Sequence, residues 1–238
     1  MELSPPTVRV LQKNTSRLIP SRFPPVGILD TIASPEDLQY IFELEGWTND
    51  RVSSELGAIM VVPADEWVFG VPHATAIMAA YCHPYPDGGR FNDGTRGAWY
   101  AAMSLETAIR ETIFHKTKEL EEIGVFETSI EMRQYLADFD SDFHDVRAAP
   151  TYDDLHDPDS YIPGQTLGRK LLAAGSNGVL YRSVRHRGGE CIACFRAPLV
   201  MNVRQAAHFE YKWVGHPEPE IIELPGIEAH GTSGTNSP

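Results

Sequence analysis

Three side chains that can bind an anion and a sugar lie close together in residues 88–115, GGRFNDGTRGAWYAAMSLETAIRETIFH. Arg90 follows two glycines, Tyr100 ends a strand-like run, and Glu111 falls on the helix predicted after that run. A guanidinium has five donors in a fixed arrangement that fits phosphate oxygens in pairs. The two glycines allow the backbone before Arg90 to approach a ligand closely. These residue types therefore predict a site for an anionic, sugar-containing ligand.

Two further side chains in this stretch need to be weighed against Glu111. Glu106 suits the site equally well on helical periodicity alone. His115 lies four positions after Glu111, so the two are neighbours on a helix, away from the centre of its apolar stripe. We expect His115 to pack beside the site rather than to transfer a proton.

Local patterns predict the elements that carry these residues. Residues 98–102 are typical of a short strand, and Ser104 can cap a helix that runs to about residue 122. One face of that helix is apolar and should pack on the core: Leu105, Ala108, Ile109, Ile113 and Leu120. Strand and helix together would bring Tyr100 and Glu111 to one edge of the domain.

The remaining pattern mixes helices and strands without regular alternation, which favours an α+β fold over a doubly wound sheet. Residues 1–33 look extended, and residues 140–162 read as a long loop rich in Asp, Pro and Tyr. Helices are predicted at residues 34–46, 73–81 and 165–174. Strands are predicted at residues 125–130, 132–139, 178–181, 191–195 and 209–213.

Composition limits the classes of function. The 238 residues carry a formal net charge of −13, which argues against direct nucleic-acid binding by this chain. We expect no membrane span and a cytoplasmic protein, because the apolar runs are short and no signal-peptide pattern follows Met1. An acidic protein that binds an anion must build a local basic pocket. The candidates are Arg90, Arg96, Arg182, Arg185 and Arg187.

The three cysteines favour neither a disulfide framework nor a metal site. Cys191 and Cys194 are three positions apart on a predicted strand, so their side chains should point to opposite faces of the sheet. No second cysteine pair is present to complete a zinc site. We therefore expect no metal.

Two blocks of this sequence resemble the RES domain family. The first is Gly88-Gly-Arg-Phe-Asn-Asp-Gly94, followed by Tyr100, then Thr107-Ala-Ile-Arg-Glu111 and His115. The second is Asn177-Gly-Val-Leu-Tyr-Arg-Ser-Val184, which looks like the late strand that carries the family's serine. The resemblance covers roughly residues 15–215, and its specific content lies in these two blocks.

The resemblance implies an organisation and a setting. The expected fold is a mixed sheet core with flanking helices, similar to ADP-ribosyltransferase toxins. Residues 1–225 would form a single RES-type domain, with an N-terminal extension of about residues 1–60 packed on it, and residues 226–238 a disordered polar tail. Family members are toxins of toxin–antitoxin pairs that consume NAD. The implied partner is an Xre-like helix-turn-helix antitoxin, and a homodimer within a larger complex is compatible with the family.

Site residues also follow from the resemblance. Carried over by motif, Arg90, Tyr100, Glu111 and Ser183 are the expected catalytic residues, and Asn92 joins Arg90 and Tyr100 in binding NAD. The family has an arginine near the start of its domain. Arg17 and Arg22 compete for that role, with Arg17 preferred, and they lie about 70 residues before Arg90, which is farther than in the compact family pattern.

These residue types suit cleavage of the bond between nicotinamide and ribose, which leaves positive charge on the sugar. Glu111 would stabilise that charge, as carboxylates do in glycoside hydrolysis. Arg90 would bind phosphate oxygens, Tyr100 would stack on a ring and supply a hydroxyl, and Ser183 would bond Glu111 or the ribose.

Two questions stay open at this point. The acceptor of the ADP-ribosyl group can be water, inorganic phosphate or a protein side chain, which would make the protein a glycohydrolase, a phosphorylase or an ADP-ribosyltransferase. The alternative from another class is a non-catalytic module that binds a nucleotide or a partner.

Overall fold

The computed structural model describes residues 4–21, 27–31, 59–148 and 150–225. The helix predicted at residues 34–46, the tail at 226–238 and Arg22 lie outside the described residues. Within them, three α-helices and seven strands form a mixed α+β fold, so the predicted fold class is confirmed. None of the described helices is both long enough and apolar enough to span a membrane.

One seven-stranded sheet forms the centre of the fold, in the order β1-β2-β5-β4-β3-β6-β7. Because β1 also pairs with β3, the first five strands close into a ring, and β6 and β7 extend the sheet beyond it. Among the strands of the described residues, only β3 and β4 run parallel to each other. The strands are β1 (Thr7–Pro20), β2 (Trp99–Ala102), β3 (Glu127–Asp145), β4 (Gly178–Arg182), β5 (Glu190–Cys194), β6 (Met201–Val214) and β7 (Glu220–Leu224).

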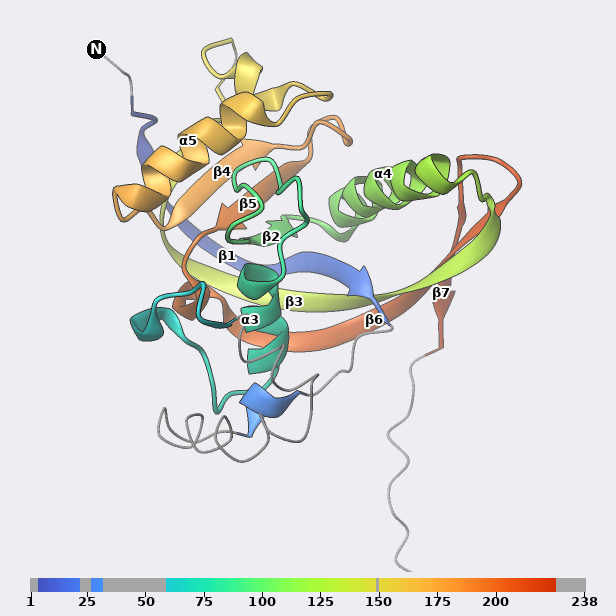
Figure 1. Cartoon of the computed structure of the whole chain (residues 1–238), viewed down its shortest axis with the longest axis horizontal. Coiled ribbons are helices and arrows are strands. Elements are labelled where there is room, and N and C mark those ends of the chain that lie inside the picture. Colours follow the sequence, from blue (N-terminus) through green and yellow to red (C-terminus); the bar gives the residue numbers. More distant parts are fainter. Residues whose placement is uncertain (1–3, 22–26, 32–58, 149, 226–238) are drawn as a thin grey trace, which may run out of the picture.

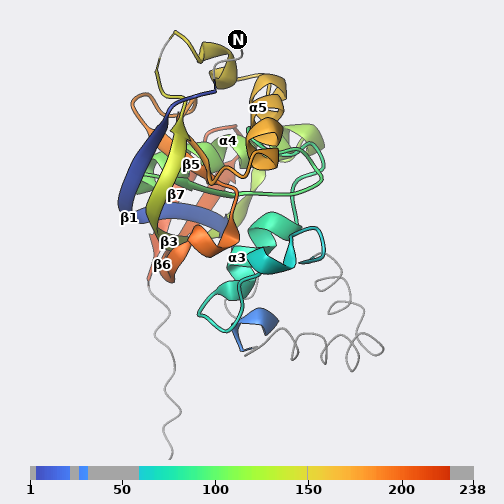
Figure 2. The same ribbon diagram turned by 90° about the vertical axis from the view of Figure 1, so that its left-hand side faces the viewer.

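Helices cover different parts of this sheet. In Figure 1, α4 (Leu105–Ile123) lies above the long strands β1, β3 and β6, and α5 (Ile162–Ala173) lies beside β4 and β5. The helix α3 (Ala74–Cys82) lies below them. The quarter turn in Figure 2 shows β1, β3 and β6 running side by side, with α5 at the upper and α3 at the lower end of the sheet.

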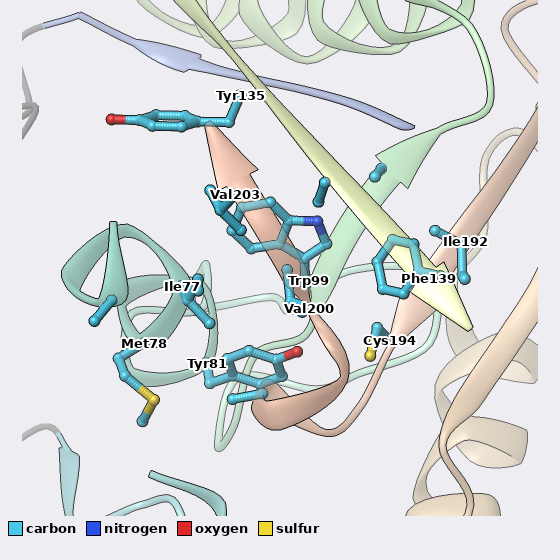
Figure 3. Close-up of a cluster of buried hydrophobic side chains, with 14 of the residues drawn as sticks. Ile77, Met78, Tyr81, Trp99, Tyr135, Phe139, Ile192, Cys194, Val200 and Val203 are labelled. Atoms are coloured by element: carbon cyan, nitrogen blue, oxygen red, sulfur yellow. The ribbon is translucent and has the colours of Figure 1, made fainter. Parts of the chain in front are cut away.

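Two hydrophobic clusters mark the two faces of the sheet. Figure 3 shows the first, in which Trp99, Tyr81 and Cys194 lie among side chains of α3, β3 and β6. The second contains Cys191 with the apolar stripe of α4 and residues of α5 and β6. Cys191 and Cys194 thus belong to opposite faces, which confirms the prediction made from their odd spacing.

The structure corrects the prediction of a loop at residues 140–162. The strand β3 continues without a break to Asp145, and the segment after it contains a short 3-10 helix, η3 (Asp153–His156), before α5 begins at Ile162. Alternation explains the error, because Phe143 is fully buried while Asp140 and Asp142 face solvent and flank Arg9 of β1. The acidic residues therefore mark the outer face of a strand rather than a loop.

Part of the N-terminal segment predicted to be extended forms β1. Residues 7–20 pair with β3 along almost their whole length, so this part of the segment belongs to the sheet. The helices predicted at 73–81 and from Ser104 are confirmed as α3 and α4. Ser104 caps α4 as expected, since its hydroxyl accepts from the Thr107 amide at 3.2 Å.

Candidate functional site

A tight turn presents Arg90. The Gly89 amide donates to the Asn92 carbonyl oxygen at 2.8 Å, and Gly88 has a φ of 73°, a conformation that favours glycine. The Tyr100 hydroxyl reaches into the turn from β2. It donates to Oδ1 of Asn92 at 2.7 Å and accepts from the Phe91 amide at 2.9 Å. Tyr100 therefore holds the turn on the sheet.

This arrangement changes the expected roles of Tyr100 and Asn92. The Asn92 amide nitrogen donates to the carbonyl oxygens of Asp93 and Arg96, so the whole side chain is engaged inside the turn. Burial raises the pKa of Tyr100, which keeps its hydroxyl protonated. The hydrogen bonds of both side chains therefore shape the turn that carries Arg90.

The Arg90 guanidinium is held on one side only. Its Nη1 donates to the carbonyl oxygens of Leu155 at 3.0 Å and Asp157 at 2.8 Å. The Tyr161 ring lies over it, with 4.8 Å between Cζ and the ring centroid. Among the described residues nothing accepts from Nε or Nη2, and neither atom is among the buried polar atoms without a partner. The Nε–Nη2 edge is therefore open, although Arg90 as a whole is only 7% exposed.

Glu111 is held in a corresponding way. It lies on α4, and its Oε1 accepts a hydrogen bond of 2.6 Å from the Ser183 hydroxyl. Within the described residues Oε2 accepts no hydrogen bond, and it too is absent from the buried unpaired atoms. Of the two acids that periodicity left equal, Glu111 is the one that meets Ser183, whereas the exposed Glu106 lies 3.5 Å from His186.

The Ser183 hydroxyl has no further capacity to bond a ligand. It accepts from the backbone amides of Arg185 at 3.1 Å and His186 at 2.9 Å, and its single hydrogen goes to Glu111. A hydroxyl has one donor and two acceptor positions, so all three are filled. The two amides fix the direction of the hydrogen, which requires an accepting oxygen on Glu111.

Electrostatic effects indicate that Arg90 and Glu111 act on the same buried groups. Burial is the main cause that raises the pKa of both Tyr181 and Cys191. The charge of Glu111 raises these pKa values further, and the charge of Arg90 lowers them. Burial raises the pKa of Tyr100, and the charge of Arg90 opposes part of that rise. The structure pairs Glu111 with Ser183 and Tyr100 with the turn that carries Arg90. Phe91, next to Arg90, packs on Tyr181, two residues before Ser183, with 5.0 Å between the ring centroids.

His115 lies one turn after Glu111 on α4 and keeps contact with solvent. Its packed surroundings, followed by the positive charge of Arg185, lower its pKa to about 4. The imidazole is therefore neutral near pH 7.

A cavity of about 570 Å³ opens beside Ser183. Its walls include Arg187 from the connection between β4 and β5, His156 at the end of η3, and Pro158 from the segment after η3. Of the four predicted catalytic residues, only Ser183 lines it. His156 is fully used within the protein, since Nδ1 meets the Tyr152 carbonyl oxygen at 2.8 Å and Nε2 accepts from the Arg182 amide at 3.2 Å.

Positive charge without a carboxylate partner gathers around this region. Among the described residues, Arg90, Arg185 and Arg187 form no ion pair with Asp or Glu. The sequence candidates Arg96 and Arg182 are different, because Arg96 pairs with buried Glu66 at 2.5 Å and Arg182 with Asp153 at 2.7 Å. Unpaired arginines in a chain of net charge −13 favour an anionic ligand.

Arg17, the first of the two N-terminal arginines considered, lies on β1 and contacts β2. Its Nη1 donates to the Tyr100 carbonyl oxygen at 3.0 Å, and its guanidinium lies over the Trp99 ring at 4.9 Å. Burial lowers its pKa. These contacts place Arg17 behind β2, where it supports the strand that carries Tyr100.

The contribution of η3 and of the segment between η3 and α5 was not predicted. Backbone carbonyls of Leu155 in η3 and of Asp157 after it accept from Arg90, and that of Pro158 accepts from Arg185 at 2.5 Å. Arg185 also stacks on Phe114 of α4 at 3.3 Å. A cluster of Asp, Pro and Tyr had indicated only a loop, and backbone acceptors leave no signature in a sequence.

A ring of strands with α3, α4 and α5 around it defines a mixed α+β protein. The serine-held Glu111 and the partly engaged Arg90 make it a candidate for binding an anionic ligand. The RES domain matches residues 65–214, which is more than half of the chain. The chain therefore belongs to the RES domain family.

Two known proteins are similar to this chain. The protein y4oC of Sinorhizobium fredii (strain NBRC 101917 / NGR234) is 28% identical over 203 residues, which is 84% of this chain and 82% of that protein. A crystal structure of the MbcT–MbcA toxin–antitoxin complex of M. tuberculosis contains a chain with a TM-score of 0.40 and 14% identity. That similarity covers 53% of this chain and 73% of the other.

Proposed function

We propose that this protein is the toxin of a toxin–antitoxin pair and that it cleaves the bond between nicotinamide and ribose in NAD. Family membership supports the toxin role. The observation that carries the chemistry is the 2.6 Å hydrogen bond from Ser183 to Glu111, which leaves Oε2 of Glu111 unpaired in a region that also contains the open edge of Arg90.

In this reaction the C1′–N bond of the ribosyl nicotinamide breaks, and its electron pair goes to the ring nitrogen. Nicotinamide leaves as a neutral molecule, and positive charge develops on the ribose. The Glu111 carboxylate stabilises that charge through Oε2, by direct interaction or by accepting from a ribose hydroxyl. A nucleophile then forms a bond to C1′ and loses its proton to solvent. No metal enters this scheme, because nicotinamide is already a good leaving group.

Arg90 would bind the pyrophosphate. Its Nε and Nη2 lie on one edge of the guanidinium and can bond two oxygens at once, which fixes both the position and the orientation of the dinucleotide. Nη1 is already committed to the backbone carbonyls of Leu155 and Asp157. Binding therefore requires no rearrangement of those contacts.

The roles of Ser183 and Tyr100 are to position the contacting groups. Ser183 orients Glu111, and Tyr100 supports the turn below Arg90. Arg17 supports Tyr100 in turn through its backbone carbonyl.

The acceptor distinguishes three versions of the proposal: glycohydrolase with water, phosphorylase with inorganic phosphate, and ADP-ribosyltransferase with a protein side chain. Incubation of NAD with the purified protein, with and without phosphate and with a cell lysate, would separate them by product. Free ADP-ribose, ADP-ribose 1″-phosphate and labelled protein are the three respective products. Binding of NAD without any product would instead favour a non-catalytic module.

The expected cellular effect is growth arrest when the protein is expressed alone in the cytoplasm. A Glu111→Gln variant should not arrest growth. The proposed partner is an Xre-like helix-turn-helix antitoxin, which would supply the DNA contacts that the acidic chain lacks. Co-expression with the neighbouring gene should restore growth, and the product of that gene should copurify with the toxin. A toxin that stays active and unbound in the presence of that product would count against this partner.

A further inference from the structure

The helix α5 approaches the turn that carries Arg90 unusually closely. A Cβ atom added to Gly164 would lie 2.2 Å from the Arg90 carbonyl oxygen, and one added to Gly168 would lie 1.9 Å from that of Phe91. Between these two glycines, Nε2 of Gln165 donates to the carbonyl oxygens of Asp87 at 2.7 Å and Gly89 at 3.1 Å. The first two turns of α5 are thus docked directly on the backbone of this turn.

Tyr161 precedes α5 and is carried by that docking. Its ring covers one face of the Arg90 guanidinium at 4.8 Å, while the carbonyl oxygens of Leu155 and Asp157 hold Nη1 in the guanidinium plane. An arginine side chain has many rotamers, and its charge is attracted to the face of an aromatic ring. Ring and carbonyls together leave Nε–Nη2 as the one edge that the described residues do not engage.

We infer that Tyr161 is a positioning residue that clamps Arg90, so that the guanidinium presents its Nε–Nη2 edge to the diphosphate of the ligand. This inference rests on the proposed function for its ligand, but the clamp itself is a property of the free protein. The aromatic face carries the effect. The Tyr161 hydroxyl makes no hydrogen bond to a described residue, so its removal should change little.

Three variants test the clamp. Tyr161→Phe keeps the aromatic face, and Tyr161→Leu removes it while retaining an apolar side chain. Tyr85→Leu is the matched control, because Tyr85 forms a similar contact with Lys116, 5.9 Å from Nζ to the ring centroid, and is itself exposed. Circular dichroism and thermal melting would establish that all three fold.

The first readout is kinetic. We expect Tyr161→Leu to raise KM for NAD about tenfold, which corresponds to about 1.4 kcal/mol, with a much smaller change in kcat. Tyr161→Phe and Tyr85→Leu should retain the wild-type KM. A rise in KM in Tyr161→Phe equal to that in Tyr161→Leu would overturn the clamp. An unchanged KM in Tyr161→Leu would also overturn it.

The second readout needs no activity, so it separates failure of the clamp from failure of the proposed function. Nitrogen-15 NMR of the side-chain guanidinium groups detects an arginine whose rotation is restricted. The signal that disappears from the spectrum of the Arg90→Lys variant is the signal of Arg90. We expect the Arg90 Nη signals to be resolved in the wild type and in Tyr161→Phe, and to broaden in Tyr161→Leu. Unchanged Arg90 signals in Tyr161→Leu would overturn the clamp even if the protein cleaves NAD.

Discussion

Ser183 donates its only hydroxyl hydrogen to Glu111 at 2.6 Å while it accepts from two backbone amides, so the serine is a fixed support for the carboxylate. The support comes from the end of β4 and the carboxylate from α4, two elements that are 72 residues apart in sequence at these positions. The direction of this bond makes Ser183 a residue that positions another side chain, and Glu111 the residue that would contact the ligand. The predictions below test these roles.

Replacement of Ser183 should reduce kcat without abolishing activity. In Ser183→Ala the Glu111 carboxylate loses its support, and a small misplacement of a catalytic group lowers the rate by about 100-fold. Glu111→Gln keeps an oxygen that accepts from Ser183 but removes the charge, so we expect a loss of about 100- to 1000-fold. Ser176→Ala is the control. The Ser176 hydroxyl also accepts from a backbone amide, that of Gly178 at 3.1 Å, but this contact lies away from the site. A Ser183→Ala variant slower than Glu111→Gln would make Ser183 a catalytic residue.

Arg90 should act mainly through substrate affinity. Arg90→Lys keeps the charge but removes the paired donors, and a hydrogen bond to a charged group contributes about 1.5–3 kcal/mol. We therefore expect KM for NAD to rise roughly 10- to 100-fold. Arg169→Lys serves as the control, since Arg169 is an exposed arginine 3.5 Å from Asp93. Equal effects of Arg90→Lys and Arg169→Lys on KM for NAD would show that Arg90 does not bind the ligand.

Tyr100 should contribute to stability as well as to the site. Tyr100→Phe leaves the Phe91 amide and Oδ1 of Asn92 without their partner, which costs about 1–3 kcal/mol in the free energy of unfolding. Tyr135→Phe is a matched control, because the buried Tyr135 hydroxyl has no hydrogen-bond partner among the described residues. Denaturant titration should show a clear loss for Tyr100→Phe and little for Tyr135→Phe; the reverse order would contradict the role of Tyr100 in the turn.

His115 should make the protein less stable in acid. Its pKa is about 4 in the folded protein, below the ordinary value of about 6.5, so the unfolded chain takes up a proton first as the pH falls. The contribution of neutral His115 to stability is present above about pH 6.5 and is lost between that pH and about pH 4. Thermal melting over this range should show a smaller fall in Tm for His115→Gln than for the wild type. An identical fall would show that His115 titrates normally.

Local patterns were sufficient for much of the fold. Capping at Ser104, the apolar stripe of α4 and the spacing of the two cysteines each depend on a few neighbouring residues, and each was predicted correctly. Most of β3 was predicted as two strands at residues 125–130 and 132–139, but its last part, residues 140–145, was predicted as a loop because it is rich in Asp. Their place on the sheet depends on pairing with β1, more than 120 residues earlier in the chain.

The sequence named candidate site residues but could not predict their contacts. Glu111 could not be separated from Glu106 by periodicity, since only the fold brings Ser183 to one of them. Tyr161 carried no recognisable signal. Gly168 lay inside the helix predicted at residues 165–174 and Gly164 directly before it, and nothing in the sequence marked their close packing. Their importance arises from close packing between α5 and the turn at Arg90, which depends on the whole sheet.

The most direct test of the account is to incubate the purified protein with NAD and to follow free nicotinamide by proton NMR. The wild type should release nicotinamide, and Glu111→Gln should release it at least about 100-fold more slowly while remaining folded. No nicotinamide from folded wild-type protein, with water, phosphate and a protein lysate each offered as the acceptor, would contradict the account.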